Sequence, residues 1–161
     1  MLKAFWIMTK LAIFAAGCFW GIEEKFLSHR GVLNTEVGYT GGITSEPSYH
    51  DVCSGETGHA EAVRVKFDQD IVSYEELVSL FFEMHDPTSL NRQGLDIGTQ
   101  YRSEIFCLDD DQYLIADAMK RKFNKEIYND KIVTSISMAE NFWIAEEYHQ
   151  KYVRKKKNMI F

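Results

Sequence analysis

The sequence has few cysteines, no long apolar run and no excess of basic residues, and each absence excludes a class of protein. No hydrophobic segment is long enough to cross a bilayer as a helix. The three cysteines include no CxxC pair, so they form neither a disulfide framework nor a zinc site. The formal net charge of −6 argues against a nucleic-acid-binding surface. Free thiols of this kind are typical of a reducing cytoplasm, which is where we expect the protein to act.

The remaining composition is that of one globular domain. The 161 residues are 45% hydrophobic and 14% aromatic, which allows a sizeable core but not two comfortable domains. No linker, repeat or low-complexity segment divides the chain, so we predict a single domain over residues 1–161. Residues 1–9 precede the first expected strand and are a candidate N-terminal extension. Residues 153–161 are expected to form a basic, solvated C-terminal tail.

Apolar periodicity predicts strands that alternate with helices around two long functional loops. The loops, at residues 31–60 and 88–102, are rich in glycine and small polar residues. This order of elements predicts an α+β or α/β fold. The expected strands are residues 11–16, 62–67, 103–108 and 131–137. One helix is expected directly after Gly17, and three more are expected at residues 73–86, 109–127 and 145–153.

The most informative string is GCFWG at residues 17–21, where a cysteine stands between an apolar run and an amphipathic stretch. The run at residues 11–16 predicts a buried strand, and the apolar residues after the string recur with the spacing of one helix face. Cys18 would then lie in the first helical turn, where unpaired N–H groups and the helix dipole stabilise a thiolate. With Phe19 and Trp20 directly behind it, the string indicates a nucleophilic cysteine beside an aromatic wall.

Other interpretations of Cys18 stay open from the string alone. A lone cysteine beside apolar residues is most often a small core residue. The lysines and the apolar run before it also loosely imitate a lipoprotein signal that ends in an acylated cysteine, although this run is short. A third alternative is a cysteine hydrolase or acyltransferase that pairs Cys18 with His149 or His85.

Glu61 is the candidate acid. It stands at the start of an alternating strand and shares a face with Val63 and Val65, which points inward. A carboxylate on an apolar face is costly to ionise, so its pKa rises and it can act as an acid near neutral pH. An exposed surface glutamate is the alternative. His59 and Glu61 also imitate the HxE of zinc deaminases, but the downstream PCxxC is absent, so we expect no metal site.

Two later stretches concentrate polar groups. The glycine-punctuated loop at residues 88–102 carries several hydrogen-bond donors, Tyr101 among them, and such loops hold polar ligands on a rigid scaffold. A solvated loop without a ligand is the alternative. Near the C-terminus, His149 could bind a substrate or cap a helix.

Five strings together resemble, in order, the peptide methionine sulfoxide reductase A family. The match runs from about residue 11 to residue 152, and the order of the strings makes it specific where any single one would be weak. The strings are GCFWG (17–21), GYTGG (38–42), VCSGETGHAE (52–61), GTQYRS (98–103) and YHQKY (148–152). The resemblance implies an α/β roll with a mixed central sheet flanked by helices.

The resemblance also implies an activity and a set of residue roles. The enzyme would reduce the S epimer of methionine sulfoxide, free or in proteins, as a repair of oxidative damage. Cys18 would be the nucleophile and would pass through a sulfenic acid. The other implied roles are hydrogen bonding to the sulfoxide oxygen (Glu61, Tyr49 and Tyr101), a pocket for the S-methyl group (Phe19 and Trp20) and contact with the rest of the substrate (Asp96 and His149).

The chain departs from many family members because no cysteine follows the last matched string. We therefore expect an external thiol, such as thioredoxin or dithiothreitol, to regenerate Cys18, with Cys53 or Cys107 as a less favoured internal partner. The resemblance implies no bound cofactor and a monomer. A non-catalytic module that captures methionine-containing peptides is a further alternative.

Overall fold

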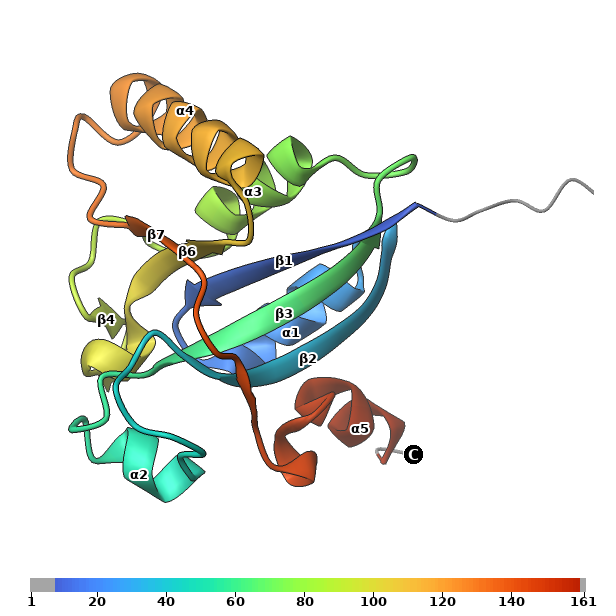
Figure 1. Cartoon of the computed structure of the whole chain (residues 1–161), viewed down its shortest axis with the longest axis vertical. Coiled ribbons are helices and arrows are strands. Elements are labelled where there is room, and N and C mark those ends of the chain that lie inside the picture. Colours follow the sequence, from blue (N-terminus) through green and yellow to red (C-terminus); the bar gives the residue numbers. More distant parts are fainter. Residues whose placement is uncertain (1–7, 160–161) are drawn as a thin grey trace, which may run out of the picture.

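A computed structural model describes residues 8–159 and contains one mixed sheet with helices packed on it (Figure 1). The strands are β1 (Thr9–Ala16), β2 (Val32–Thr40), β3 (Ala60–Asp68), β4 (Arg92–Gln93), β5 (Asp96–Ile97), β6 (Ser103–Cys107), β7 (Ser135–Met138) and β8 (Trp143–Ile144). Six of them form a sheet in the order β7-β6-β1-β3-β2-β8, while β4 and β5 form a separate hairpin. Neighbours in the larger sheet are antiparallel except β6 and β7, which are parallel. This arrangement confirms the predicted α+β class with a mixed central sheet.

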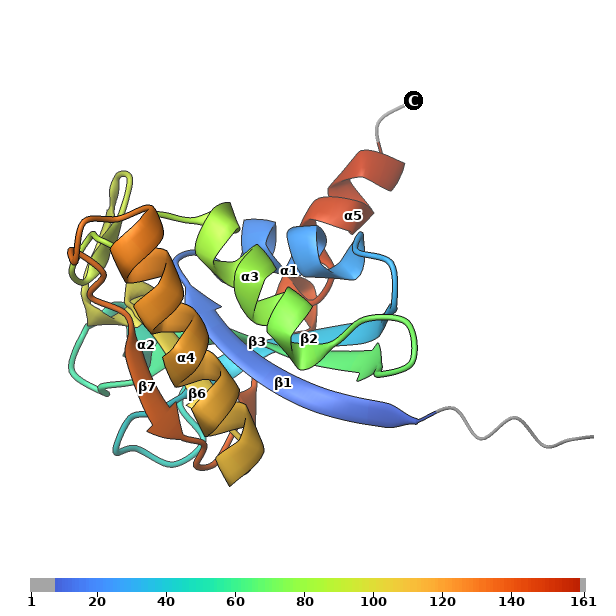
Figure 2. The ribbon, with the colours of Figure 1, turned by 90° about the horizontal axis from the view of Figure 1, so that it is seen from above.

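The longer helices cover one side of this sheet (Figure 2). The helices are α1 (Phe19–Leu27), α2 (Tyr49–Cys53), α3 (Tyr74–Met84), α4 (Asp110–Glu126) and α5 (Tyr152–Asn158), with short 3₁₀ helices η1 (Thr99–Tyr101) and η2 (Glu147–His149). Ser73 and Asp109 cap α3 and α4, since each side chain accepts a hydrogen bond from a first-turn N–H. Both helices therefore begin where the sequence predicts.

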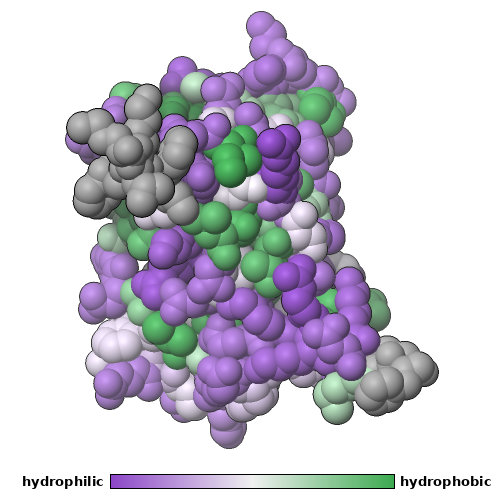
Figure 3. All heavy atoms as spheres, turned by 90° about the vertical axis from the view of Figure 1, so that its right-hand side faces the viewer, coloured by the Kyte–Doolittle hydropathy of each residue, from purple (hydrophilic) through white to green (hydrophobic). Residues whose placement is uncertain are grey.

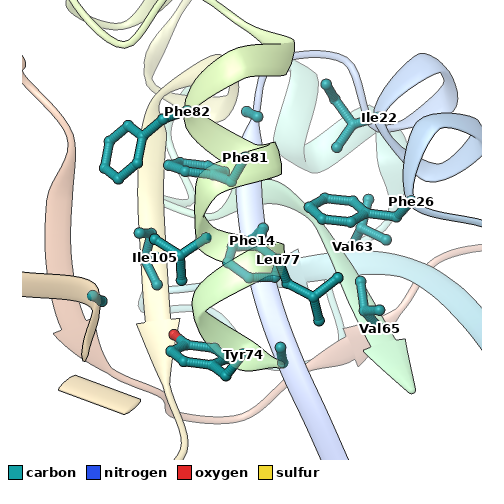
Figure 4. Close-up of a cluster of buried hydrophobic side chains, with 14 of the residues drawn as sticks. Phe14, Ile22, Phe26, Val63, Val65, Tyr74, Leu77, Phe81, Phe82 and Ile105 are labelled. Carbon is teal, nitrogen blue, oxygen red and sulfur yellow. The ribbon is translucent and has the colours of Figure 1, made fainter. Parts of the chain in front are cut away.

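Phe14 of β1 lies at the centre of the main core (Figure 4). Its ring stacks on Phe26 of α1 at 5.0 Å and on Phe81 of α3 at 5.4 Å between ring centroids. Aromatic pairs of this kind contribute about 0.5–1.5 kcal/mol each beyond the area they bury. Because β1 and α1 are both held in this core, the corner that joins them at Gly17 and Cys18 has a fixed position.

The opposite face of the sheet has a smaller apolar cluster. Ile13, Ala15, Ala62 and Phe106 are buried there, and the half-buried Phe142 packs against them. On the surface shown in Figure 3, polar residues cover most of the face and apolar residues form small separate groups. Within residues 8–159, none of the helices has both the length and the apolar character needed to span a membrane.

The prediction of two long loops is wrong in part, because residues 31–60 contain β2 and α2, and residues 88–102 contain β4, β5 and η1. Gly38 lies inside β2, where a Cβ atom would come within 2.4 Å of the Trp143 carbonyl oxygen in β8. The glycine therefore marks a close approach of two strands rather than a turn. The short α2 is defined by a capping box in which the side chains of Ser48 and Asp51 each accept the other's backbone N–H.

Two C-terminal predictions are also wrong in position. The strand expected at residues 131–137 is β7, which begins four residues later beside β6. The helix expected at residues 145–153 is replaced by η2 and α5, because Lys151 has a φ of 53° and interrupts the helix. The predicted basic tail is largely the helix α5, which is anchored by Arg154 and Lys157 on Glu24 of α1.

The candidate N-terminal extension at residues 1–9 lies largely outside the described residues. The structure begins to describe the chain at Met8, and β1 begins at Thr9.

Candidate active site

Cys18 lies at the corner between β1 and α1, as the sequence predicts, and is the N-cap residue of α1. Gly17 makes the corner possible, because its φ of +96° lies in the region that favours glycine. A Cβ atom at Gly17 would also come within 2.8 Å of the Gln93 side chain, so glycine lets the β4 strand approach the corner. The Cys18 side chain is half-buried at this point.

The net shift of the Cys18 pKa is upward, opposite to the direction expected from the helix start. Burial of the thiol raises its pKa, and the nearby carboxylates of Glu61 and Asp96 raise it further. The N–H groups of Trp20 and Gly21 act in the opposite direction, as the helix-start argument requires, but they do not outweigh burial. The neutral thiol is therefore the favoured form, and a thiolate needs a partner that offsets its burial.

Glu61 lies on β3 with its side chain facing the interior, and the residue is 2% exposed. Its Oε1 accepts a hydrogen bond of 3.1 Å from the N–H of Phe19, the residue after Cys18. Burial raises the pKa of Glu61 to about 7, and the charge of Asp96 adds to the rise, while the Phe19 N–H opposes it. The burial confirms the prediction of an inward-facing carboxyl group, and the raised pKa is the direction that an acid near neutral pH requires.

Aromatic rings surround His149 and form the wall beside Cys18. The rings of Phe19, Trp20 and Tyr49 lie 5.2, 5.7 and 4.5 Å from the imidazole centroid. The Trp20 indole N–H donates to Nδ1 of His149 at 2.9 Å, so Nε2 carries the proton of the neutral imidazole. Nε2 is buried and has no hydrogen-bond partner among the described residues, so this donor is unsatisfied in the structure.

Tyr49, Tyr101 and Asp96 come from three separate segments and complete the cluster. Burial raises the pKa of Tyr49 above its usual range and raises the pKa of Tyr101 to about 12, with the charge of Glu61 adding to both shifts. Both hydroxyls therefore remain donors at neutral pH. Asp96 lies exposed on the β4–β5 hairpin, near enough for its charge to act on Cys18, Glu61 and Tyr101. The structure thus brings all eight predicted residues together.

The alternative of a cysteine–histidine pair is not supported by the hydrogen bonds. The ring nitrogens of His85 lie 2.6 Å from the Phe81 carbonyl oxygen and 2.7 Å from the Ser103 hydroxyl. His149 is instead bonded to Trp20. Within residues 8–159, no group of three or more His, Cys, Asp or Glu side chains is arranged to hold a metal ion.

The other two cysteines differ in accessibility. Cys53 is exposed at the end of α2, whereas Cys107 is buried in the main core. Burial raises the pKa of the Cys107 thiol to about 11, so this thiol is unreactive at neutral pH.

Sequence analysis missed two carboxylates that hold the site together. Glu146 accepts hydrogen bonds from the Tyr39 hydroxyl at 2.9 Å and from the Tyr49 N–H at 3.0 Å, and so fixes α2 against β2. Glu23 is buried in α1 one turn after Phe19. The sequence does indicate that Glu23 is unusual, because it places a charged residue within the apolar face of that helix. No pattern in the sequence indicates the role of Glu146.

Comparisons with known proteins agree with this geometry. The model of the family described as "Peptide methionine sulfoxide reductase" matches residues 10–160. A "Probable peptide methionine sulfoxide reductase" of Schizosaccharomyces pombe is 49% identical over 151 residues, which cover 91% of this chain and 89% of that protein.

Solved structures of Mxr1 from Saccharomyces cerevisiae share the fold. Its reduced form superposes with a TM-score of 0.88 at 37% identity, over 92% of this chain and 86% of that chain. Mxr1 in complex with Trx2 gives a TM-score of 0.65 at 26% identity, over 93% and 91% of the two chains. The chain belongs to the peptide methionine sulfoxide reductase family.

Proposed function

We propose that this protein reduces the S epimer of methionine sulfoxide, free or in proteins, to methionine, and so repairs oxidative damage. The observation that carries the proposal is that Cys18 is held beside an acid. The backbone N–H of Phe19, the residue after Cys18, donates to Glu61, whose pKa is about 7. A sulfoxide sulfur is a poor electrophile until its oxygen accepts a proton or strong hydrogen bonds. A thiolate on the sulfur and an acid on the oxygen therefore lower the barrier together.

The first half of the reaction breaks the S–O bond. Cys18 gives up its proton and its sulfur attacks the sulfoxide sulfur, while Glu61, Tyr49 and Tyr101 hydrogen-bond the oxygen. A new S–S bond forms as the S–O bond breaks. The oxygen leaves as water with two protons, one donated by Glu61 and one taken from solvent, which balances the proton that Cys18 released to solvent before the attack.

The second half releases methionine. Water attacks the Cys18 sulfur, the S–S bond breaks, and methionine leaves with the electron pair. The proton that the attacking water loses returns to Glu61. Cys18 is left as a sulfenic acid, oxidised by two electrons, and the sulfoxide has been reduced by two.

Phe19, Trp20, His149 and Asp96 hold the rest of the substrate in this proposal. The rings of Phe19 and Trp20 receive the S-methyl group, which removes its apolar surface from water. The unpartnered Nε2–H of His149 donates to a carbonyl or carboxylate oxygen of the substrate main chain, which supplies the missing acceptor. Asp96, exposed on the hairpin, accepts from a substrate N–H.

An external thiol regenerates Cys18. Its sulfur attacks the sulfenic sulfur and water leaves, and a second thiol then frees Cys18 and carries away the disulfide. The complex of Mxr1 with Trx2 supports a thioredoxin-like reductant, and dithiothreitol would serve in vitro. The three free thiols fit a reducing cytoplasm. A Cys18–Cys53 or Cys18–Cys107 disulfide after one turnover without reductant would contradict this route.

The separated epimers of a methionine sulfoxide peptide test the proposal. With dithiothreitol present, the protein should convert the S epimer to methionine and leave the R epimer unchanged, as measured by chromatography of the peptide. Membership of the family supports this choice, because one methionine sulfoxide reductase serves each sulfoxide epimer. Reduction of the R epimer, or of neither epimer, would overturn the proposed function.

A further inference from the structure

Glu23 is a carboxylate inside the apolar side of α1 that the proposed chemistry does not use. The residue is 1% exposed. Its Oε2 accepts from the Thr35 hydroxyl at 2.8 Å and lies 3.6 Å from the Lys151 ammonium, and its Oε1 accepts from the Lys151 backbone N–H at 2.6 Å. A buried charge is tolerated only when it is paired and hydrogen-bonded in this way, so α1, β2 and the C-terminal segment are tied at one point.

Lys151 stands between the two residues of the C-terminal segment that contact Trp20. Two residues before it, His149 accepts the Trp20 indole N–H at 2.9 Å. One residue after it, Tyr152 stacks on the Trp20 ring at 3.9 Å and 11°. The left-handed backbone of Lys151, with a φ of 53°, is what allows η2 and α5 to present these two side chains to the same indole. Glu23 holds the N–H of this strained residue.

A second clamp acts on the neighbouring residue. The Gln150 side chain accepts from the Val37 N–H and donates to the Val37 carbonyl oxygen, both at 2.9 Å, in the manner of a paired strand. Gln150 therefore fixes the segment along β2, while Glu23 fixes it against α1. Glu23 lies on the same helix as Trp20, three residues further along, as does Glu24, which pairs with Arg154 and Lys157 of α5. Glu23 is the anchor on α1 that bonds Lys151 itself, between the two residues that contact Trp20.

We propose that Glu23 is a positioning residue for substrate binding, which acts by anchoring Lys151 so that His149 and Tyr152 hold Trp20 in the substrate wall. This inference rests on the proposed function, because the wall is the part of the site that receives the S-methyl group. Glu23 does not touch the reacting atoms. Its loss should therefore weaken binding of the sulfoxide and leave the chemical step nearly intact.

Steady-state kinetics with a methionine S-sulfoxide peptide and dithiothreitol test the inference. Glu23→Gln keeps the size of the side chain but loses the charge that pairs with Lys151. It should raise KM by about tenfold and change kcat by less than about threefold. In a Trp20→Ala background the same substitution should raise KM by less than about twofold, because the group that Glu23 positions is then absent.

Thr35→Val is the matched control. It removes another hydrogen bond to the same carboxylate but leaves the Glu23–Lys151 contacts in place, so KM should stay within about twofold of the wild-type value. A merely structural role predicts a different pattern, in which thermal stability falls and KM is unchanged. The inference is overturned by that pattern, or by an equal rise in KM in the wild-type and Trp20→Ala backgrounds.

Lys151→Met provides a second variant if Glu23→Gln does not fold. It removes the ammonium but keeps the backbone N–H, so KM should rise by about threefold, and this rise too should vanish in the Trp20→Ala background. The activity of the wild-type protein distinguishes a failure of the proposed function from a failure of the role of Glu23. If it reduces neither epimer, the proposed function fails. If it reduces the S epimer but both variants match it in KM, only the role of Glu23 fails.

Discussion

Cys18→Ser should lose sulfoxide reduction almost completely, with turnover reduced by about 10⁴-fold or more. A serine hydroxyl is far harder to ionise than a thiol and is a much weaker nucleophile toward sulfur. The half-buried corner at Cys18 would raise the cost of an alkoxide further, since burial already raises the pKa of the thiol. Methionine formed from the S epimer measures the loss.

Cys53→Ser is the matched control for this substitution. Cys53 is exposed, and a serine keeps a group that can hydrogen-bond Tyr49 as the thiol does, so the replacement should keep turnover within about threefold of the wild-type value. Circular dichroism of both variants would show whether the fold is retained. Turnover by folded Cys18→Ser would rule out Cys18 as the nucleophile.

Glu61→Gln should reduce kcat by about 10²–10⁴-fold, the range for the loss of a general acid. The amide keeps a hydrogen-bond donor for the sulfoxide oxygen but cannot transfer a proton. KM should change little, because the methyl pocket and the His149 donor are untouched. A fall in kcat of less than about threefold would contradict the acid role.

The pH profile of kcat/KM gives a sharper signature for Glu61. The reactive molecules hold a proton on Glu61 and none on Cys18. The pKa of Glu61, about 7, lies below the raised pKa of Cys18. The fraction of protein molecules in this reactive form therefore rises with pH up to about 7 and then stays level until the pKa of Cys18. Above the Cys18 pKa the fraction falls.

In Glu61→Gln only the ionisation of Cys18 remains. The rate should therefore keep rising above pH 7, where the wild-type rate is level, and should not fall at high pH. A profile that matches the wild-type shape from acid to alkaline pH would show that Glu61 does not supply the proton.

The site was predictable where one local pattern fixed both the position and the environment of a residue. The apolar run before Gly17 and the helix face after it place Cys18 at a corner, and alternation with Val63 and Val65 turns Glu61 inward. Neither inference needs knowledge of distant contacts. The family resemblance added Tyr49, Tyr101, Asp96 and His149, whose sequence surroundings alone leave a solvated loop or a helix cap equally open.

The failures arise where tertiary contacts decide the outcome. Gly38 was assigned to a loop because the approach of the β8 backbone, which requires glycine there, is invisible in a local window. The pKa of Cys18 was predicted in the wrong direction because the helix start is local, whereas the burial that outweighs it comes from the folded chain. At Lys151, where the helix is interrupted, the backbone N–H is bound by Glu23, which lies 128 residues away in sequence.

A single turnover without reductant tests the central claim most directly. The wild-type protein, mixed with an excess of the S-sulfoxide peptide, should form one methionine per protein molecule and stop. Dimedone should then react with the sulfenic acid on Cys18, with loss of its oxygen as water, and peptide mass mapping should find one dimedone adduct on Cys18. A product yield well below one per molecule, or an oxygen carried by another residue while Cys18 stays a free thiol, would contradict the account.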